Sequence, residues 1–306
     1  MSAPDFPAWS ALALARVEQA LTDWVPAAAP ARLGDAMRYA VLDGGKRLRP
    51  LLVLASAEAV QGNGSAALRA ACAVELIHAY SLVHDDMPCM DNDVLRRGKP
   101  TVHVQYGEAQ ALLAGDALQA LAFETLASSP LPSERRCAML TELAQAAGAS
   151  GMCGGQALDI DATGGHEPKP PADPASPSTQ RLAALEHMHA LKTGALLRCG
   201  IRLGALAAGV DAATRDSLDR YAHALGLAYQ IRDDLLDVEG DSAQLGKTAG
   251  KDVAQGKETF PALLGIHASR DRLVHLLAVM QQSLSDAGIQ ATALSKLARQ
   301  VVERSH

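Results

Sequence analysis

Residues 66–93 read AALRAACAVELIHAYSLVHDDMPCMDND, an apolar stretch that runs into a cluster of aspartates. The apolar part is built mainly from Ala, Leu and Val, and Ala and Leu are strong helix formers. It predicts a buried helix over about Ala66–Met87, with Ser65 as its cap and an interruption at Pro88. The first pair of aspartates therefore stands at the end of an apolar helix.

The rest of the chain repeats this helical composition. Hydrophobic residues make up 48% of the 306 residues and aromatic residues only 3%, so Ala, Leu and Val supply the apolar content. No strand-like alternation is found, and an all-α fold is expected. The other predicted helices cover about Ala8–Val25, Ala31–Leu42, Pro50–Val60, Val102–Ser128, Pro132–Gly148, Thr179–Ala208 and Ala212–Val238, with more helix after Pro261. A loop is expected at Asp91–Pro100, and the glycine-rich residues 148–155 are expected to be flexible and closely packed.

Residues 164–178 read GGHEPKPPADPASPS and carry five prolines, which predicts a surface loop. Such a segment is compatible with a boundary between two domains. However, helices of the same Ala- and Leu-rich kind are predicted on both sides of it. We therefore favour one domain spanning residues 1–306, with an exposed insertion at about 164–178.

Charge and cysteine usage narrow the class of protein. Lys and Arg total 28 against 34 Asp and Glu, a net charge of -6, which gives no basic surface for nucleic acid. The five cysteines are odd in number and form no CxxC pair, which favours a reducing compartment. The start, MSAPDFPAWS, does not resemble a signal peptide, and no run of 18 uncharged apolar residues appears. A cytoplasmic protein with no membrane span is expected.

The first aspartate cluster, HDDMPCMDND, predicts a cation site. Carboxylates packed at the end of a buried helix are unfavourable without a cation, and Mg²⁺ takes oxygen ligands together with substrate phosphates. The spacing does not match a calcium-binding EF-hand loop, and His84 and Cys89 lack the partners that zinc requires. Asp85 and Asp91 lie off one face of a straight helix, so the distortion at Pro88 is expected to bring them together.

The second cluster, YQIRDDLLD, places Asp233 and Asp237 four residues apart on one helix face, with Gln230 on the same side. Like charges at this spacing repel, so a cation should offset them. Magnesium is one candidate. An ion-paired surface formed with Arg232 or with lysines of the next loop is the other, and this cluster alone leaves both open.

Basic residues near the clusters indicate an anionic ligand. Arg suits bidentate contact with phosphate, and Lys supplies a point charge. Together they suggest two anion sites, one with metal and one without. The residues concerned are Lys46, Arg49, Arg96, Arg97, Lys192, Lys247 and Lys257.

Seven motifs in this order resemble those of the short-chain trans-polyprenyl diphosphate synthases, and in particular the bacterial farnesyl diphosphate synthases. They are GGKRLRP, HAYSLVHDDMPCMDNDVLRRGKPTVH, GDAL, GMCGGQALD, KTG, YQIRDDLLD and LGK, and the resemblance runs from about Asp35 to Pro261. It implies helices around a deep central cavity, a homodimer, and isoprenoid diphosphates as substrates. The implied reaction condenses isopentenyl diphosphate with dimethylallyl and geranyl diphosphate to give farnesyl diphosphate.

The resemblance also implies roles for individual residues. Three Mg²⁺ ions, for which Mn²⁺ can substitute, are expected at Asp85 and Asp91, supported by Asp86, and at Asp233, with Asp237 beyond it. The catalytic set is then Asp85, Asp86, Asp91, Lys192 and Asp233. The expected contacts of the allylic diphosphate are Arg96, Lys192, Thr193, Gln230, Lys247 and Lys257. Those of isopentenyl diphosphate are Lys46, Arg49, His78 and Arg97.

Product length is expected to depend on the helix before Asp85. In the family, an aromatic residue five positions before the first aspartate forms the floor of the cavity. Tyr80 stands there, followed by Ser81, and both are expected to influence product length. On an ideal helix Ser81 aligns with Asp85 better than Tyr80 does, so the assignment depends on resemblance, and Tyr80 as an ordinary core aromatic stays open. Four other histidines are interpreted as structural, namely His84, His103, His187 and His189. Gln156 and Asp159 are expected in the cavity wall, and Arg299 and Arg304 are candidates for closing the diphosphate site.

Three other functions share some of these features. A geranyl or geranylgeranyl diphosphate synthase would carry the same site. A terpene cyclase would not need the second, metal-free diphosphate site that Lys46, Arg49 and Arg97 indicate. A non-catalytic partner subunit would have no need for aspartates in both clusters.

Overall fold

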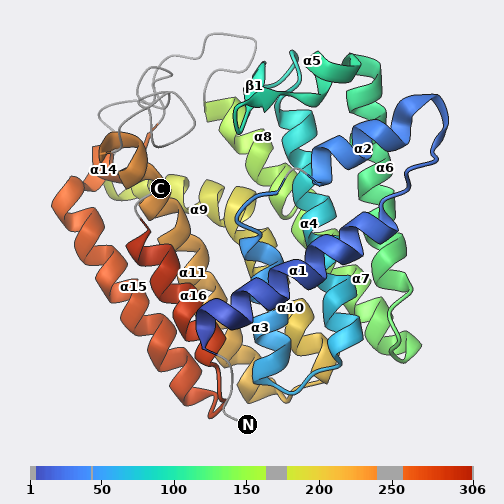
Figure 1. The fold of residues 1–306 in the computed structure, drawn as a ribbon. Coiled ribbons are helices and arrows are strands. Elements are labelled where there is room, and N and C mark those ends of the chain that lie inside the picture. Colours follow the sequence, from blue (N-terminus) through green and yellow to red (C-terminus); the bar gives the residue numbers. More distant parts are fainter. Residues whose placement is uncertain (1–4, 43, 163–177, 240–257, 305–306) are drawn as a thin grey trace. The chain divides into compact units, whose positions relative to one another are not determined.

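The structure is a computed structural model that describes residues 5–42, 44–162, 178–239 and 258–304. The chain divides into two compact units. The first comprises Met1–Leu143, Gly200–Val210 and Gln290–Ala293, and the second comprises Ala144–Cys199, Asp211–Ile289 and Leu294–His306. Nearly all regular structure in the described residues is helical, which confirms the all-α prediction (Figure 1).

The first unit holds the helices of the N-terminal half and one short hairpin. Its elements are α1 (Phe6–Trp24), η1 (Pro30–Arg32), α2 (Leu33–Val41), α3 (Leu48–Ala59), α4 (Gly64–Asp85), β1 (Leu95–Arg96), β2 (Lys99–Pro100), α5 (Val102–Tyr106), α6 (Glu108–Ala127) and most of α7 (Ser133–Ala147). Helix α10 (Ala195–Ala208) enters this unit from Gly200 onward.

Helix α4 is the core of the first unit. It packs against α3 and α6, and Figure 1 shows α4 and α6 side by side. Its cap is the Asn63 side chain, which accepts from two backbone amides, so the expected cap at Ser65 and end at Met87 are wrong. By length and composition α4 could cross a membrane, but 72% of its apolar window is buried in the protein, as in a core helix.

Small residues let the helices of this unit approach closely. A Cβ added at Gly204 of α10 would lie 2.5 Å from the Val53 carbonyl oxygen of α3. Close by, the Ser56 hydroxyl donates to the Ile201 carbonyl at 2.8 Å. The low aromatic content of the sequence is thus matched by close helix packing at small residues such as Gly204 and Ser56.

The second unit is also helical. Its elements are α8 (Met152–Ala162), α9 (Ser178–His189), the π-helical turn η2 (Ala190–Gly194), the start of α10, α11 (Ala212–Glu239), α14 (Phe260–Leu264), α15 (Ile266–Asp286) and most of α16 (Thr292–Glu303). Helices α11 and α15 lie side by side (Figure 1). The predicted interruption at Lys192-Thr193-Gly194 is the π-helical turn.

Two loop predictions need correction. Residues 148–155 were expected to be flexible, but α8 already begins at Met152. Close packing there is confirmed, because a Cβ at Gly155 would lie 2.1 Å from the backbone nitrogen of Lys192. The expected loop at Asp91–Pro100 contains the β1–β2 hairpin, in which Arg96 faces Lys99. The prolines of the predicted insertion, with Lys247 and Lys257, lie outside the described residues.

Candidate active site

The first aspartate cluster closes on itself where α4 ends. The chain turns through Pro88, and the Asp91 amide donates to the Asp85 carbonyl oxygen at 2.8 Å. The left-handed backbone of Asn92, with φ of 51°, completes this turn. Asp85 is half-buried and Asp91 is exposed. The prediction that the two aspartates are brought together is confirmed for their backbones.

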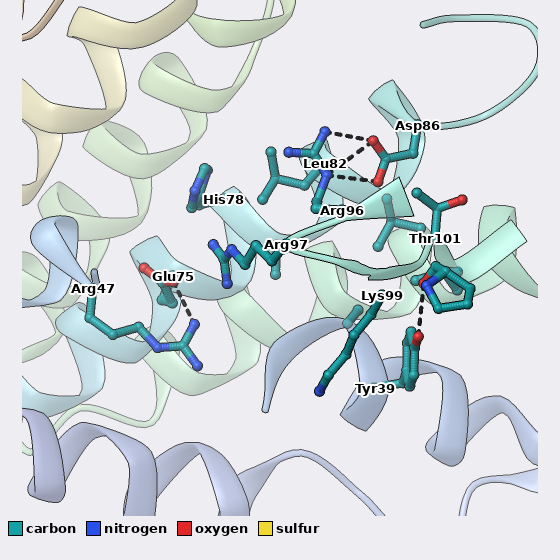
Figure 2. A pocket seen from close by; sticks show the side chains of 15 residues that line it. Tyr39, Arg47, Glu75, His78, Leu82, Asp86, Arg96, Arg97, Lys99 and Thr101 are labelled. Atoms are coloured by element: carbon teal, nitrogen blue, oxygen red, sulfur yellow. Dashed lines mark hydrogen bonds and ion pairs between the residues drawn. The ribbon is translucent and has the colours of Figure 1, made fainter. Parts of the chain in front are cut away.

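Asp86 is the buried member of this cluster and pairs with Arg96. The Arg96 guanidinium donates to both Asp86 carboxylate oxygens, at 2.8 Å from Nε and 2.5 Å from Nη2 (Figure 2). Burial raises the pKa of the Asp86 carboxyl, and the hydrogen bonds from Arg96 oppose that rise. The pair anchors the β1–β2 hairpin to the end of α4, which fits a supporting role for Asp86.

Arginines gather around His78, about two turns before the end of α4. Burial lowers the pKa of His78 well below 6.5, and the charges of Arg49, Arg97, Arg96 and Arg47 lower it further. The Arg49 Nε is buried and has no hydrogen-bond partner among the described residues. Asp86 and Glu75 balance the charges of Arg96 and Arg47, so the site beside the neutral imidazole is moderately basic, and its guanidinium groups suit contact with a diphosphate.

The Gly44-Gly45 pair shapes the loop beside this site. Arg97 Nη1 donates to the Gly44 carbonyl at 2.5 Å. Gly45 has φ of 126°, and a Cβ there would lie 2.7 Å from the same Arg97 nitrogen. Gly45 is therefore needed for the Arg97 guanidinium to reach the loop that carries Lys46. Lys46 itself is exposed.

Arg47 has a structural role that the sequence did not reveal. Its buried guanidinium donates to Glu18 at 2.6 Å, to Glu75 at 2.7 Å and to the Val41 carbonyl at 2.6 Å. Its backbone φ is 44°, in the left-handed region. In the GGKRLRP motif Arg47 looks like its basic neighbours Lys46 and Arg49. Only its contacts in the folded protein show that it is a structural residue.

A cavity of about 530 Å³, counted with its open mouth, lies in the first unit next to these residues. Figure 2 shows His78, Arg96 and Arg97 at one side of the pocket, with Tyr39 and Lys99 at another. Its lining includes the polar side chains of His78, Asp86, Arg96 and Arg97 and the apolar side chains of Leu82 and Val83. Basic and apolar side chains thus share one concave surface in the first unit.

The two residues expected to set product length lie on α4 one turn before the aspartates. Tyr80 is 5% exposed and packs edge-on against the His84 ring, with centroids 5.8 Å apart. The Ser81 hydroxyl donates to the His78 carbonyl of its own helix at 2.9 Å. Tyr80 is therefore a buried aromatic with a defined neighbour.

In the second unit, the π-helical turn positions Lys192 and Thr193. Lys192 Nζ bonds the Asp159 carboxylate at 2.5 Å, which gives Asp159 a partner that the sequence had not assigned. Thr193 Oγ1 donates to Gln230 Oε1 at 3.4 Å, and Gln230 in turn donates to Asp234 at 2.8 Å. Residues from α8, η2 and α11 are thus linked by polar contacts within one unit.

The second aspartate cluster carries a cation that was not expected as its partner. Arg304 donates to Asp233 Oδ1 at 2.5 Å and to the Tyr229 carbonyl at 3.0 Å. Arg232, the cation proposed from the sequence, instead donates to the Arg304 carbonyl at 2.6 Å. The repulsion on α11 is therefore offset by a residue 71 positions away.

The donor atoms at both clusters are carboxylate oxygens, which Mg²⁺ prefers. Among the residues that the structure describes, no group of three or more His, Cys, Asp or Glu side chains is gathered as a metal site. Mg²⁺ keeps several waters and uses one or two carboxylates with substrate phosphates, so a pair of aspartates is sufficient. The clusters fit magnesium held together with a phosphate ligand, and they do not fit a metal held by the protein alone.

Comparison with known proteins agrees with this arrangement. The family model for polyprenyl synthetase matches residues 30–297. The chain belongs to the polyprenyl synthetase family. Among members of this family, the farnesyl diphosphate synthase of Escherichia coli (strain K12) is 49% identical over 279 residues, which are 89% of each chain.

Two further relatives mark the range of products in the family. Geranylgeranyl pyrophosphate synthase 11 of Arabidopsis thaliana is 45% identical over 273 residues, 88% of this chain and 74% of its own length. The crystal structure of an FPP/GFPP synthase from Zymomonas mobilis matches with a TM-score of 0.82 and 38% identity, covering 97% of this chain and 99% of the other. Polyprenyl synthetase family members of this similarity thus include enzymes named for different products.

Proposed function

We propose that this polyprenyl synthetase makes farnesyl diphosphate, by condensing isopentenyl diphosphate with dimethylallyl and then geranyl diphosphate. The observation that supports it most is the arginine cluster around a neutral His78, beside the aspartates that end α4. A positive, partly apolar cavity next to a carboxylate pair suits a substrate that carries both a diphosphate and a hydrocarbon.

The aspartates act on the allylic substrate. Asp85, Asp91 and Asp233 bind magnesium, Asp86 holds Arg96 in place, and Asp237 supports Asp233. Mg²⁺ held there, for which Mn²⁺ could substitute, would supply positive charge to balance the negative charge that develops on the departing diphosphate. The side chains proposed to contact the allylic diphosphate directly are Arg96, Lys192, Thr193, Gln230, Lys247 and Lys257.

The arginine cluster binds the second substrate. Lys46, Arg49, His78 and Arg97 contact the diphosphate of isopentenyl diphosphate, which does not leave in this reaction. The buried Arg49 Nε supports this role because it has no hydrogen-bond partner among the described residues. An unsatisfied N–H donor of this kind can bind an anionic ligand without first breaking a protein contact.

The protein accelerates the reaction by positioning and by charge. When the allylic carbon–oxygen bond breaks, the electron pair leaves with the diphosphate, and Lys192 and Arg96 stabilise that charge. The double bond of isopentenyl diphosphate then attacks the allylic cation, and one proton is lost from the adduct to the released pyrophosphate. Apolar lining such as Leu82 and Val83 keeps water from the cation.

Several features of the assembly belong to the same proposal. The chain acts as one domain and as a homodimer in the cytoplasm. Helices α5 and α6 carry exposed apolar side chains, which support a subunit contact through these helices. They are Val104, Leu112 and Leu113. All five cysteines are free thiols, which fits a reducing compartment.

The product decides between the proposed function and its nearest alternative. Purified protein with magnesium, isopentenyl diphosphate and dimethylallyl diphosphate should give mainly the fifteen-carbon product. A dominant twenty-carbon product would favour a geranylgeranyl diphosphate synthase, the alternative that the Arabidopsis relative makes worth testing. Tyr80→Ala should lengthen the product, and an unchanged length would remove Tyr80 as the floor of the cavity.

A further inference from the structure

His84 connects the proposed floor residue to a second helix. Its ring lies edge-on to Tyr80 of the same helix, with centroids 5.8 Å apart and ring planes at 75°. Its Nε2 lies 3.1 Å from the Leu112 carbonyl oxygen of α6. Because a carbonyl oxygen can only accept, this contact assigns the proton to Nε2. The His84 imidazole thus contacts the backbone of α6 through Nε2 and the ring of Tyr80 on its own helix.

Gly115 of α6 makes room for this ring. A Cβ at Gly115 would lie 2.0 Å from His84 Nε2, 2.5 Å from Cδ2 and 2.7 Å from Cε1. Distances this short exclude any side chain at position 115 while the ring stays where it is. Glycine is unfavourable inside a helix, and Gly115 stands in the interior of α6, so the space for His84 explains its presence.

We propose that His84 is a positioning residue for product length, and that Gly115 sets the depth at which its ring sits. The inference rests on the proposed function, in which Tyr80 limits the growing chain. A hydrogen bond to a helix backbone fixes the plane of the His84 ring, and that ring fixes the Tyr80 ring by an edge-to-face contact. Without the imidazole, Tyr80 gains freedom to turn aside and admit a longer hydrocarbon.

The role differs from that of an ordinary core histidine. Packing alone would make a His84 variant less stable or slower, and the ratio of products would stay the same. A positioning role changes that ratio even at equal turnover. A positioning role also requires that the change in product ratio caused by a His84 variant depends on Tyr80. It requires likewise that a Gly115 variant changes the ratio only by moving His84.

The test compares ratios of twenty-carbon to fifteen-carbon product, measured at equal substrate conversion with thermal unfolding as a check on folding. His84→Ala should raise the ratio by about five-fold or more. His84→Gln keeps a side-chain N–H for the Leu112 carbonyl but removes the ring, so it should raise the ratio nearly as much. His103→Ala is the matched control, since His103 bonds Thr101 at 3.0 Å on α5, and it should leave the ratio unchanged.

Gly115→Ala supplies a second, independent test. Its Cβ should displace the His84 ring and raise the ratio in the parent protein, while adding nothing in a His84→Ala background. Likewise His84→Ala should add nothing to Tyr80→Ala. If both His84 variants keep the parent ratio while the parent makes farnesyl diphosphate, the inference is wrong and the proposed function stands. If the parent makes no prenyl product at all, the proposed function fails and the inference fails with it.

Discussion

Arg47→Met is the perturbation whose size the structure defines best. The Arg47 side chain is 3% exposed and that of Glu75 is 4% exposed, so their ion pair is almost fully withdrawn from water. Replacing Arg47 leaves the Glu75 carboxylate buried without this partner, and it also removes the donor to the Val41 carbonyl. Glu18, 37% exposed, can recover its hydration. Breaking a buried pair on one side costs about 3–5 kcal/mol of unfolding free energy.

Two companion variants make this prediction specific. Arg47→Met with Glu75→Leu removes both buried charges, so it should recover most of the lost stability. Arg220→Gln breaks an exposed ion pair with Asp286, in which the two charged groups are 3.4 Å apart and the side chains are 51% and 43% exposed. Its loss should cost about 0–1 kcal/mol of unfolding free energy. Urea unfolding followed by circular dichroism measures all three against the parent. A loss below about 1 kcal/mol for Arg47→Met, or no recovery in the double variant, would refute the assigned role of Arg47.

The remaining predictions concern titration and the C-terminal arginine. Burial is the main cause that lowers the pKa of His78 in the folded protein, and the charges of Arg49 and Arg97 add to it. A histidine in the unfolded chain keeps a pKa of about 6.5, so below that pH the unfolded state binds a proton that the folded state does not. Parent stability should therefore fall by up to about 1.4 kcal/mol per pH unit more than that of His78→Asn, and parallel profiles from urea unfolding at each pH would contradict this. Arg304 pairs with Asp233, a proposed metal ligand, and the pair would compete with metal for the same carboxylate. Arg304→Gln should therefore lower the Mg²⁺ concentration for half-maximal activity by about 2- to 10-fold, equivalent to a partly exposed ion pair of about 0.5–1.4 kcal/mol. A metal titration of both proteins checks this, and an unchanged or higher requirement would mean that Arg304 does not compete with the metal.

Local sequence determines most of the helix boundaries. The predicted helix Ala212–Val238 agrees with α11 to within one residue, because its Ala- and Leu-rich pattern is uninterrupted. The cap of α4 was misplaced by two residues, since Asn63 and Ser65 are both good capping residues and only the backbone distinguishes them. Helix α8 was missed because its glycines serve close packing, which composition alone cannot distinguish from flexibility.

Contacts between residues far apart in the sequence could not be predicted from it. The sequence indicated that Asp233 needs a cation, but the structure supplies Arg304, which no local pattern connects to α11. It indicated basic residues after Gly44-Gly45, but not that Arg47 turns inward to Glu75. Both cases depend on contacts between distant residues, which periodicity and spacing do not encode.

The central claim is that both aspartate clusters serve one magnesium-dependent prenyl transfer, and the turnover of three single variants tests it most directly. Asp85→Ala and Asp233→Ala should each lower turnover by about a hundredfold or more, since each removes a proposed metal ligand worth several kcal/mol of transition-state stabilisation. Asp216→Ala, at an exposed position on α11, should keep the parent rate. Near-normal turnover of either Asp85→Ala or Asp233→Ala would contradict the account.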